Sequence, residues 1–156
     1  MFELEIPGFG YIRLEHLVSD FTGTLSVDGK LLQGVKEKLN EIAKFLSVHI
    51  LTADTFGMAK AELVDVNCEI HILTGENHDV QKEEYVKSLG SEGVVTLGNG
   101  SNDRRMLREA KIGIAICLDE GCSVDAVQSA DILVKSPADA LDLMLNPKRM
   151  KATLRF

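Results

Sequence analysis

The sequence predicts an α/β fold: a doubly wound, Rossmann-like parallel sheet with helices on both faces. Short apolar runs alternate along the chain with segments whose apolar residues recur at spacings of three and four. The runs are apolar at consecutive positions, which is typical of parallel strands that are covered on both faces. The length of 156 residues and the apolar content of 45% fit one domain with one core, residues 1–156.

The individual elements follow from these two patterns in chain order. We expect strands at 14–19, 48–51, 69–73, 94–97, 112–117 and 132–134. Between them we expect helices at 33–46, 59–64, 81–89, 103–110 and 123–129. Because each strand is followed by a helix, the strands are expected to lie parallel to one another.

The two ends of the chain fall outside this alternation. Residues 2–6 and 11–13 flank the turn-rich segment Pro7–Gly10, which predicts an N-terminal β-hairpin that extends or covers one edge of the sheet. Residues 146–156 carry a local excess of basic side chains. We interpret them as a solvated or edge-docking tail, with a binding patch as the alternative.

The charge balance and the lack of long apolar runs exclude several classes of function. The 17 basic and 24 acidic residues give a net charge of -7, with no basic run that could neutralise a nucleic-acid backbone, so we expect no nucleic-acid partner. No apolar stretch approaches the roughly 20 residues of a membrane helix, and the N-terminus lacks a basic signal region. We therefore expect a cytoplasmic protein with no membrane partner. The three cysteines lack a paired C-x-x-C spacing, so neither a disulfide framework nor a zinc site is predicted.

Polar residues follow the expected strands at the positions where such folds bind ligands. In an open parallel sheet, ligands bind beyond the carboxyl ends of the strands. The first strand leads into Asp20–Leu25 (D-F-T-G-T-L) and the second into Thr52–Asp54 (T-A-D). Lys82 opens a helix, and the fourth strand leads into Gly98–Asp103 (G-N-G-S-N-D). We expect these four segments to meet in one site.

In this order, the four segments resemble the four motifs of the haloacid dehalogenase (HAD) superfamily. Within it, the chain is similar to the phosphorylation domain of P-type ATPases and to small relatives of that domain, over about residues 14–135. The similar stretches include Met106-Leu107, Gly113-Ile114-Ala115 and Ala130-Asp131-Ile132. The resemblance implies a HAD-like fold and a phosphatase that works through an aspartyl-phosphate at Asp20, with Mg²⁺ as cofactor.

The chemistry of the residues agrees with the roles that the resemblance implies. The carboxylate of Asp20 can attack phosphorus, which splits one hydrolysis into two easier transfers. Gly23 lets the backbone turn closely around a phosphoryl group. Thr52 offers a hydroxyl donor beside Ala53 in the same phosphate-binding segment, and Lys82 offers a positive charge for the transition state. The expected Mg²⁺ ligands are Asp20, the Thr22 carbonyl, Asn99 and Asp103, with waters completing the shell.

Each of these residues also has an ordinary structural explanation when it is taken alone. Asp20 could begin a turn, Thr52 could cap a helix, and Lys82 could be one more solvated charge. Their joint order at strand ends favours a phosphate site. Other polar residues receive structural roles: we expect Asp54 to cap the next helix, with substrate orientation as the alternative. The scattered His16, His49, His71 and His78 are expected to be structural.

Two positions depart from the superfamily pattern. HAD phosphatases usually carry a second Asp two residues after the nucleophile, as general acid and base, whereas this chain has Thr22. Losing such a group typically costs about 10²–10⁴ in rate, which matters least for the good leaving groups of acyl and aryl phosphates. The superfamily also usually places a metal-binding Asp where this chain has Asn99, so Mg²⁺ is expected to bind weakly. Slow turnover is therefore expected.

The spacing of the motifs leaves no room for a cap domain. Between Asp20 and Thr52 only a flap at 26–31 and one helix fit, and between Thr52 and Lys82 only a helix, a strand and a loop. Closure is then expected to come from a large substrate, such as a phosphoprotein or polysaccharide, or from a neighbouring subunit in a homo-oligomer, with the N-terminal hairpin as the contact.

Three functional hypotheses remain at this point. The first is a Mg²⁺-dependent phosphohydrolase that acts on a phosphorylated small molecule or macromolecule through Asp20, slowly. The second is a phosphate-binding regulatory module that keeps the pocket but hydrolyses little, which Thr22 and Asn99 favour. The third is phosphoryl transfer to an acceptor other than water.

Overall fold

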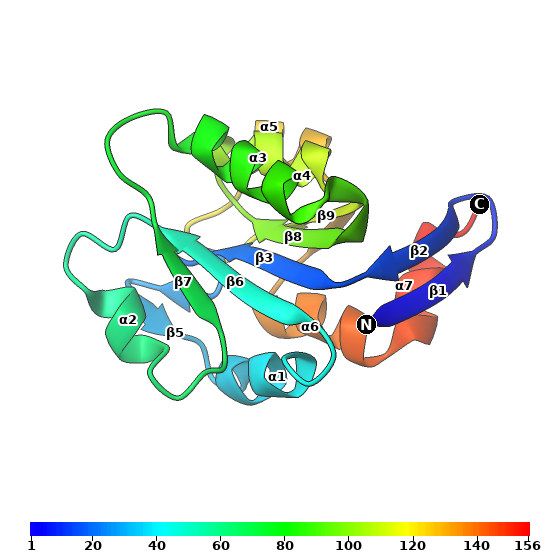
Figure 1. Cartoon of the computed structure of the whole chain (residues 1–156), viewed down its shortest axis with the longest axis horizontal. Coiled ribbons are helices and arrows are strands. Elements are labelled where there is room, and N and C mark those ends of the chain that lie inside the picture. Colours follow the sequence, from blue (N-terminus) through cyan, green and yellow to red (C-terminus); the bar gives the residue numbers. More distant parts are fainter.

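The core of the protein is a six-stranded parallel sheet. The computed structural model describes residues 1–156. The strands of this sheet are β3 (His16–Asp20), β6 (Ser47–Thr52), β7 (Glu69–Ile72), β8 (Val94–Gly98), β9 (Ile112–Ile116) and β10 (Ile132–Val134). Their spatial order is β10-β9-β8-β3-β6-β7, and every neighbouring pair is parallel (Figure 1). The predicted doubly wound parallel sheet is confirmed.

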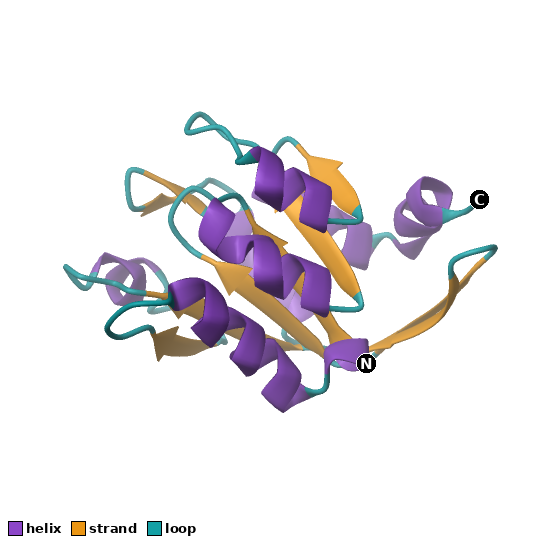
Figure 2. Ribbon diagram, turned by 90° about the horizontal axis from the view of Figure 1, so that it is seen from above, coloured by secondary structure: helices purple, strands orange, loops and turns teal.

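Helices cover both faces of the sheet, as Figures 1 and 2 show. On one face lie α3 (His78–Leu89), α4 (Arg104–Glu109) and α5 (Val124–Ser129), with contacts from α3 to α4 and from α4 to α5. On the other face α1 (Val35–Ile42) packs against α6 (Pro137–Leu145). The buried residues of α1 are Val35, Leu39 and Ile42, whose spacing of four and three forms the apolar stripe that faces the core.

Two helices at the end of the chain were not predicted. The first, α6, begins at a Ser136 side chain that accepts the Asp139 N–H, with Pro137 in the first turn. The second, α7 (Pro147–Leu154), occupies the segment that we interpreted as a tail. It buries Met150 and Leu154. Basic residues stand beside both of them in the sequence, and for that reason the segment showed no apolar periodicity.

The N-terminal hairpin is present, but it does not lie along an edge of the central sheet. Strands β1 (Phe2–Ile6) and β2 (Gly10–Leu14) form their own two-stranded sheet. This sheet projects from the start of the central strand β3 and packs against α7 (Figure 1). The last residue is tied to the hairpin turn, because the Phe156 N–H donates to the Pro7 carbonyl at 3.0 Å. The prediction that the hairpin extends or covers an edge of the central sheet was therefore wrong. The apolar side of the hairpin packs on α7 instead.

No cap domain interrupts the fold. The insertion after β3 is a small flap, in which β4 (Ser26–Val27) pairs with β5 (Lys30–Leu31). The short helix α2 (Met58–Glu62) lies beside it, and Glu62 Oε2 accepts the Leu31 N–H at 3.1 Å. The remaining elements are two single 3₁₀ turns, η1 (Ser91–Gly93) and η2 (Ser101–Asp103). The open end of the sheet is thus bordered by the flap, by loops and by the first turns of α2 and α3.

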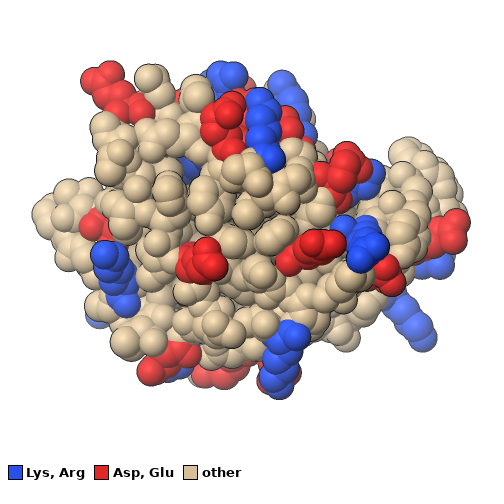
Figure 3. All heavy atoms as spheres, viewed as in Figure 1, with Lys and Arg blue, Asp and Glu red and all other residues tan.

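The surface mixes charges of both signs. On the face in Figure 3, acidic and basic side chains are interspersed among uncharged residues. Several are paired, such as Lys36 with Asp65 at 3.0 Å and Lys44 with Glu41 at 2.8 Å. No helix has the length and apolar composition needed to cross a bilayer.

Candidate active site

Asp20 lies where the sheet changes its winding direction. From β3 the chain runs through β6 and β7 on one side and then crosses to β8, β9 and β10 on the other side. Asp20 is the last residue of β3, between Thr52 at the end of β6 and Gly98 at the end of β8. Such a switch point leaves a crevice beyond the strand ends, because the adjacent connections leave in opposite directions.

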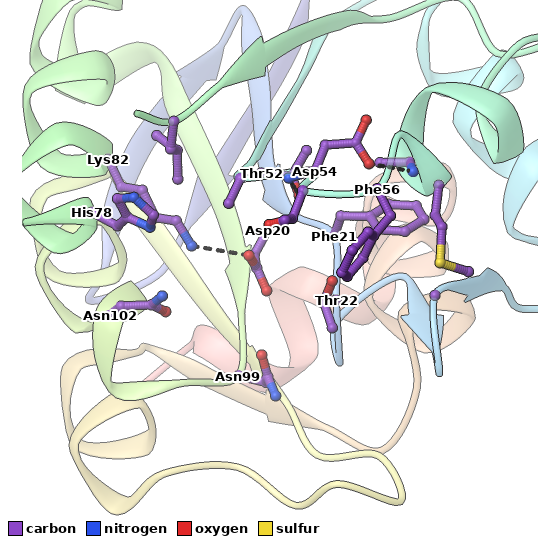
Figure 4. Close-up of a pocket in the computed structure, with 16 residues that line it drawn as sticks. Asp20, Phe21, Thr22, Thr52, Asp54, Phe56, His78, Lys82, Asn99 and Asn102 are labelled. Carbon is purple, nitrogen blue, oxygen red and sulfur yellow. Dashed lines mark hydrogen bonds and ion pairs between the residues drawn. The ribbon is translucent and has the colours of Figure 1, made fainter. Parts of the chain in front are cut away.

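A buried lysine pairs with two carboxylates at this point. Lys82 Nζ lies 2.9 Å from Asp20 Oδ1 and 2.6 Å from Asp103 Oδ1, and the lysine side chain is only 1% exposed. Figure 4 shows Lys82 reaching toward Asp20 from α3. The helix begins at His78, so Lys82 lies in its second turn rather than at its start as predicted.

Asp103 is enclosed rather than facing the crevice. Its Oδ2 accepts the N–H groups of Asn99 and Gly100, each at 3.0 Å, while Oδ1 accepts from Lys82. A Cβ atom at Gly98 would lie 2.6 Å from the Asp103 Cβ, so a glycine is needed there for the carboxylate to fold back on its loop. Asp103 therefore positions Lys82 and the Asn99 loop, and three of the roughly four acceptor sites of its carboxylate are already used.

Burial and the neighbouring charges shift the pKa values of Asp20 and Lys82. Desolvation, reinforced by the nearby Asp103 charge, raises the pKa of Asp20 to about 6, although Lys82 and the Thr24 hydroxyl oppose the rise. For Lys82, desolvation acts to lower the pKa, but the two carboxylates outweigh it and raise the pKa above its ordinary value. The lysine is therefore charged at neutral pH, whereas ionisation of the buried Asp20 carboxyl group costs free energy.

The loop after Asp20 brings oxygen atoms together on the other side of the carboxylate. Thr24 Oγ1 lies 3.0 Å from Asp20 Oδ2 and 3.2 Å from Asn99 Oδ1. One hydroxyl hydrogen cannot satisfy both acceptors, so two oxygen atoms converge with incomplete hydrogen bonding. This donor set fits a hard divalent cation such as Mg²⁺. No cluster of three His, Cys, Asp or Glu side chains forms a stronger metal site.

Gly23 does not line the pocket, but it allows the Asn99 side chain to lie close to the loop after Asp20. Its φ is 76°, and its N–H donates to the Ser26 carbonyl at 2.9 Å. A Cβ atom here would lie 2.6 Å from Asn99 Nδ2 and 2.7 Å from Glu120 Oε2. Glycine thus lets the Asn99 side chain approach Asp20, while the Gly23 N–H itself is used within the loop by the Ser26 carbonyl.

A pocket of about 410 Å³ opens above Asp20. Of the predicted site residues, Asp20, Thr22, Thr52, Ala53, Lys82 and Asn99 line it, whereas Gly23 and Asp103 do not. Figure 4 shows His78, Lys82 and Asn102 on one side of Asp20, and Phe21 and Phe56 on the other. The site therefore has a polar side and an aromatic side.

Sequence reasoning missed the buried Thr24 behind the pocket and three residues of the pocket wall. Thr24 was passed over within the first motif, and His78, Phe56 and Met58 received no site role. His78 lies four residues before Lys82, on the same inward side of α3, and that spacing was the only available signal for it. Phe56 and Met58 lie in and after a loop, whose position depends on the tertiary fold.

The predicted cap by Asp54 is confirmed, although Asp54 also lines the pocket, so a role in substrate orientation stays a prediction. The structural prediction for the histidines holds for His16 and His49, whereas His78 lines the pocket. Asp54 caps α2, because its carboxylate accepts the N–H groups of Ala59 at 2.7 Å and Lys60 at 3.3 Å. His16 Nδ1 lies 3.1 Å from His49 Nε2, and His49 Nδ1 lies 2.9 Å from the Tyr85 hydroxyl. Neither of these histidines lines the pocket.

Sequence comparison gives relatives of two kinds. No family model matches the chain. The uncharacterized protein MJ0073 of Methanocaldococcus jannaschii is 44% identical over 73 residues, which are 47% of this chain and 78% of that protein. The probable copper-exporting P-type ATPase of Archaeoglobus fulgidus is 32% identical over 114 residues, which are 72% of this chain. The match spans only 14% of the ATPase. The chain therefore shares a family with MJ0073 and a segment with the ATPase.

Structural comparison independently identifies the fold. The 3-deoxy-D-manno-octulosonate 8-phosphate phosphatase of Moraxella catarrhalis, solved with magnesium, phosphate and the sugar acid, superimposes with a TM-score of 0.70. The match covers 91% of this chain and 94% of that chain at 17% identity. At this identity the likeness shows the fold alone.

Proposed function

Because the chain belongs to the HAD superfamily and resembles the phosphorylation domain of P-type ATPases, we propose that it is a Mg²⁺-dependent phosphohydrolase with Asp20 as nucleophile. One observation carries the proposal: Asp20 lies at the switch point of the sheet, paired with buried Lys82 and open to a pocket. The phosphatase of M. catarrhalis, which was solved with magnesium and phosphate, supports the same chemistry on the same fold.

The first step uses groups that already face the pocket. An oxygen of Asp20 attacks phosphorus, and the bond from phosphorus to the leaving oxygen breaks with its electron pair. Thr52 Oγ1 accepts the Asp54 N–H at 3.2 Å, so its own hydrogen is free to donate to a phosphoryl oxygen. Lys82 supplies a positive charge beside Asp20. This charge stabilises the negative charge that the phosphoryl oxygens gain in the transition state. Water then attacks the aspartyl-phosphate and restores the carboxylate.

A divalent cation fits the oxygen-rich side of the site. Asp20 Oδ2, Asn99 Oδ1 and the Thr22 carbonyl would hold it, with Asp103 supporting the Asn99 loop through its two N–H contacts. When bound, the ion supplies charge neutralisation for the phosphoryl group. It also relieves the cost that burial imposes on the negative charge of Asp20, because an adjacent cation favours the ionised carboxylate.

The proposal is tested by turnover in matched variants. We expect the wild-type protein with Mg²⁺ to release phosphate from acetyl phosphate and phenyl phosphate, and Asp20→Asn to release none above background. Asp28→Asn makes the same chemical change on the exposed flap turn, where a φ of 52° also suits Asn. It should keep wild-type turnover. If Asp20→Asn is as active as Asp28→Asn, the nucleophile is misassigned.

A second candidate function is a phosphate-binding regulatory module. Thr22, which is exposed at the pocket, cannot act as an acid or base near neutral pH, and Asn99 lowers the charge available to a cation. Both departures fit a site that binds phosphate but releases product slowly. Saturable phosphate binding, measured by calorimetry, without Asp20-dependent turnover would favour the module over the enzyme.

A further inference from the structure

The aromatic side of the pocket differs chemically from the side that holds the phosphoryl group. Phe56 and Met58 are exposed, Phe56 by 89% and Met58 by 42%, and both line the same pocket as Asp20. In Figure 4 the Phe56 ring lies on the opposite side of Asp20 from Lys82. An open aromatic ring beside a reacting centre offers a flat apolar surface to whatever leaves phosphorus.

The backbone holds this aromatic wall in place. Asp54 accepts two N–H groups of α2 and donates its own N–H to Thr52, so the loop that carries Phe56 is fixed at both ends. Met58 lies against the flap turn, where a Cβ atom on Gly29 would approach the Met58 Cε to 2.5 Å. Met58 therefore packs on the flap, and the loop that carries Phe56 is anchored beside it through Asp54.

This wall offers no charge to a second anionic group. The only lysine or arginine that lines the pocket is Lys82, which is already paired with Asp20 and Asp103. His78, the other basic side chain, lies on the polar side, and its Nε2 is 3.0 Å from the Gly75 carbonyl. Asp54, which also lines the pocket, uses both carboxylate oxygens on N–H groups of α2. A leaving group on the aromatic side is therefore best matched when it carries no second negative charge and presents an apolar surface to Phe56.

Thr22 places a second, independent requirement on the leaving group of the substrate. With no acid at this position, the leaving oxygen departs as an anion, so this anion must be weakly basic and its conjugate acid must have a low pKa. A phenol, with a pKa of about 10, meets this condition far better than an alkyl alcohol. An acyl phosphate meets it too, but a small acyl group leaves the ring of Phe56 uncovered.

We propose that the physiological substrate is an aryl phosphate whose aromatic ring packs on Phe56 and Met58 while its phosphoryl group faces Asp20. This substrate class rests on the phosphohydrolase function proposed above. Asp20 forms a bond to phosphorus as the bond to the phenolic oxygen breaks, and the phenolate leaves with the electron pair and takes a proton from solvent. Water then cleaves the aspartyl-phosphate, which releases inorganic phosphate and a proton.

The test compares leaving groups in matched variants. We expect Phe56→Ala to lower kcat/KM for phenyl phosphate by about tenfold, and to change kcat/KM for acetyl phosphate by less than about twofold. Phe56→Tyr, which keeps the ring, should retain the preference. Val64→Ala truncates another exposed apolar side chain, 78% exposed, that does not line the pocket, and it should change kcat/KM for neither substrate.

The outcomes separate this inference from the function on which it rests. Equal losses on both substrates, or no loss on either, would overturn the aryl assignment while Asp20-dependent turnover upheld the phosphohydrolase. No Asp20-dependent turnover of any phosphate would overturn both. A phosphotyrosine peptide and phenyl phosphate distinguish the two sources of the ring: a higher kcat/KM for the peptide identifies a protein substrate, and a higher value for phenyl phosphate identifies a small molecule.

Discussion

Two carboxylates and one ammonium share the base of the site, and the geometry gives them different tasks. Asp103 is fully buried and spends both oxygens on Lys82 and backbone N–H groups. Asp20 faces the pocket and keeps an elevated pKa of about 6. Lys82 joins them, so its removal would leave two buried carboxylates without a counter-charge. The nucleophile is thus held in place at some cost in stability.

That cost predicts a pH-dependent effect of Asp20→Asn on the metal-free protein. The folded state binds the Asp20 proton more tightly than the unfolded chain does, because the folded pKa is raised to about 6. The stabilisation from this proton is full below about pH 4 and is lost as the pH rises through 6. At pH 7 we expect Asp20→Asn to raise the free energy of unfolding by roughly 1–3 kcal/mol, with little difference at pH 4.

Urea denaturation in the presence of a chelator at pH 4 and pH 7 measures this difference, with Asp28→Asn as the neutral control. A variant that is less stable than wild type at pH 7 would show that Lys82 and Thr24 more than offset the burial of the Asp20 charge.

Thr22→Asp tests the missing acid and base. The new carboxyl group should protonate alkyl leaving groups, so we expect hydrolysis of alkyl phosphates to rise by about 10–10², with a smaller gain on phenyl phosphate. Steady-state release of phosphate from both substrates gives the comparison. An unchanged or lower rate on alkyl phosphates would mean that Thr22 is not simply the absence of an acid.

At the scale of elements, the sheet could be predicted because most of its strands are short runs of largely buried residues, although β7 alternates between exposed and half-buried positions. The buried runs of β8 and β9 are uninterrupted, so their identity does not depend on tertiary context. The helix α7 could not be predicted in the same way, since basic residues separate the few apolar side chains that it buries. The start of α3 was placed late for a similar reason: its first turn is mostly polar and buries no side chain, and His78 in it lines the pocket.

Some residues of the site could likewise be predicted from local sequence patterns, and others could not. Asp20, Thr52, Lys82 and Asn99 follow strands or lie on a helix, so motif order was enough to bring them together. The aromatic wall depends on how the loop after β6 folds over the flap, which no local pattern encodes. The enclosure of Asp103 follows from the close contact at Gly98, which only the packed structure shows.

Helix α4 and strand β9 approach closely, which gives a prediction at this scale. A Cβ atom on Gly113 would lie 2.2 Å from the Leu107 carbonyl oxygen, a backbone atom that cannot move aside without shifting the helix. We expect Gly113→Ala to lower the free energy of unfolding by at least about 2 kcal/mol. Gly93→Ala, which meets nothing closer than 3.9 Å, is the matched control and should be nearly neutral. Similar losses in both variants, measured by denaturation, would contradict this account of the contact.

At the scale of the whole molecule, function depends on topology that gathers distant segments. The switch point between β6 and β8 brings Asp20, Thr52, Lys82 and Asn99 to one crevice, although the chain visits them in separate βα units. The flap is too small to close this crevice, since β4 and β5 contain two residues each. Closure by a neighbouring subunit stays a prediction. The hairpin can offer only its outer face to such a partner, because Ile6 and Ile12 are buried.

The central claim is that Asp20 carries the phosphoryl group during turnover. Its most direct test is the intact mass of the protein, acid-quenched during reaction with phenyl phosphate and Mg²⁺, followed by mapping of the modified peptide. We predict an added phosphoryl group on Asp20 in the wild-type protein, less of it in Thr22→Asp as the intermediate breaks down faster, and none in Asp20→Asn. Turnover that proceeds without a phosphoenzyme and survives Asp20→Asn would contradict the account.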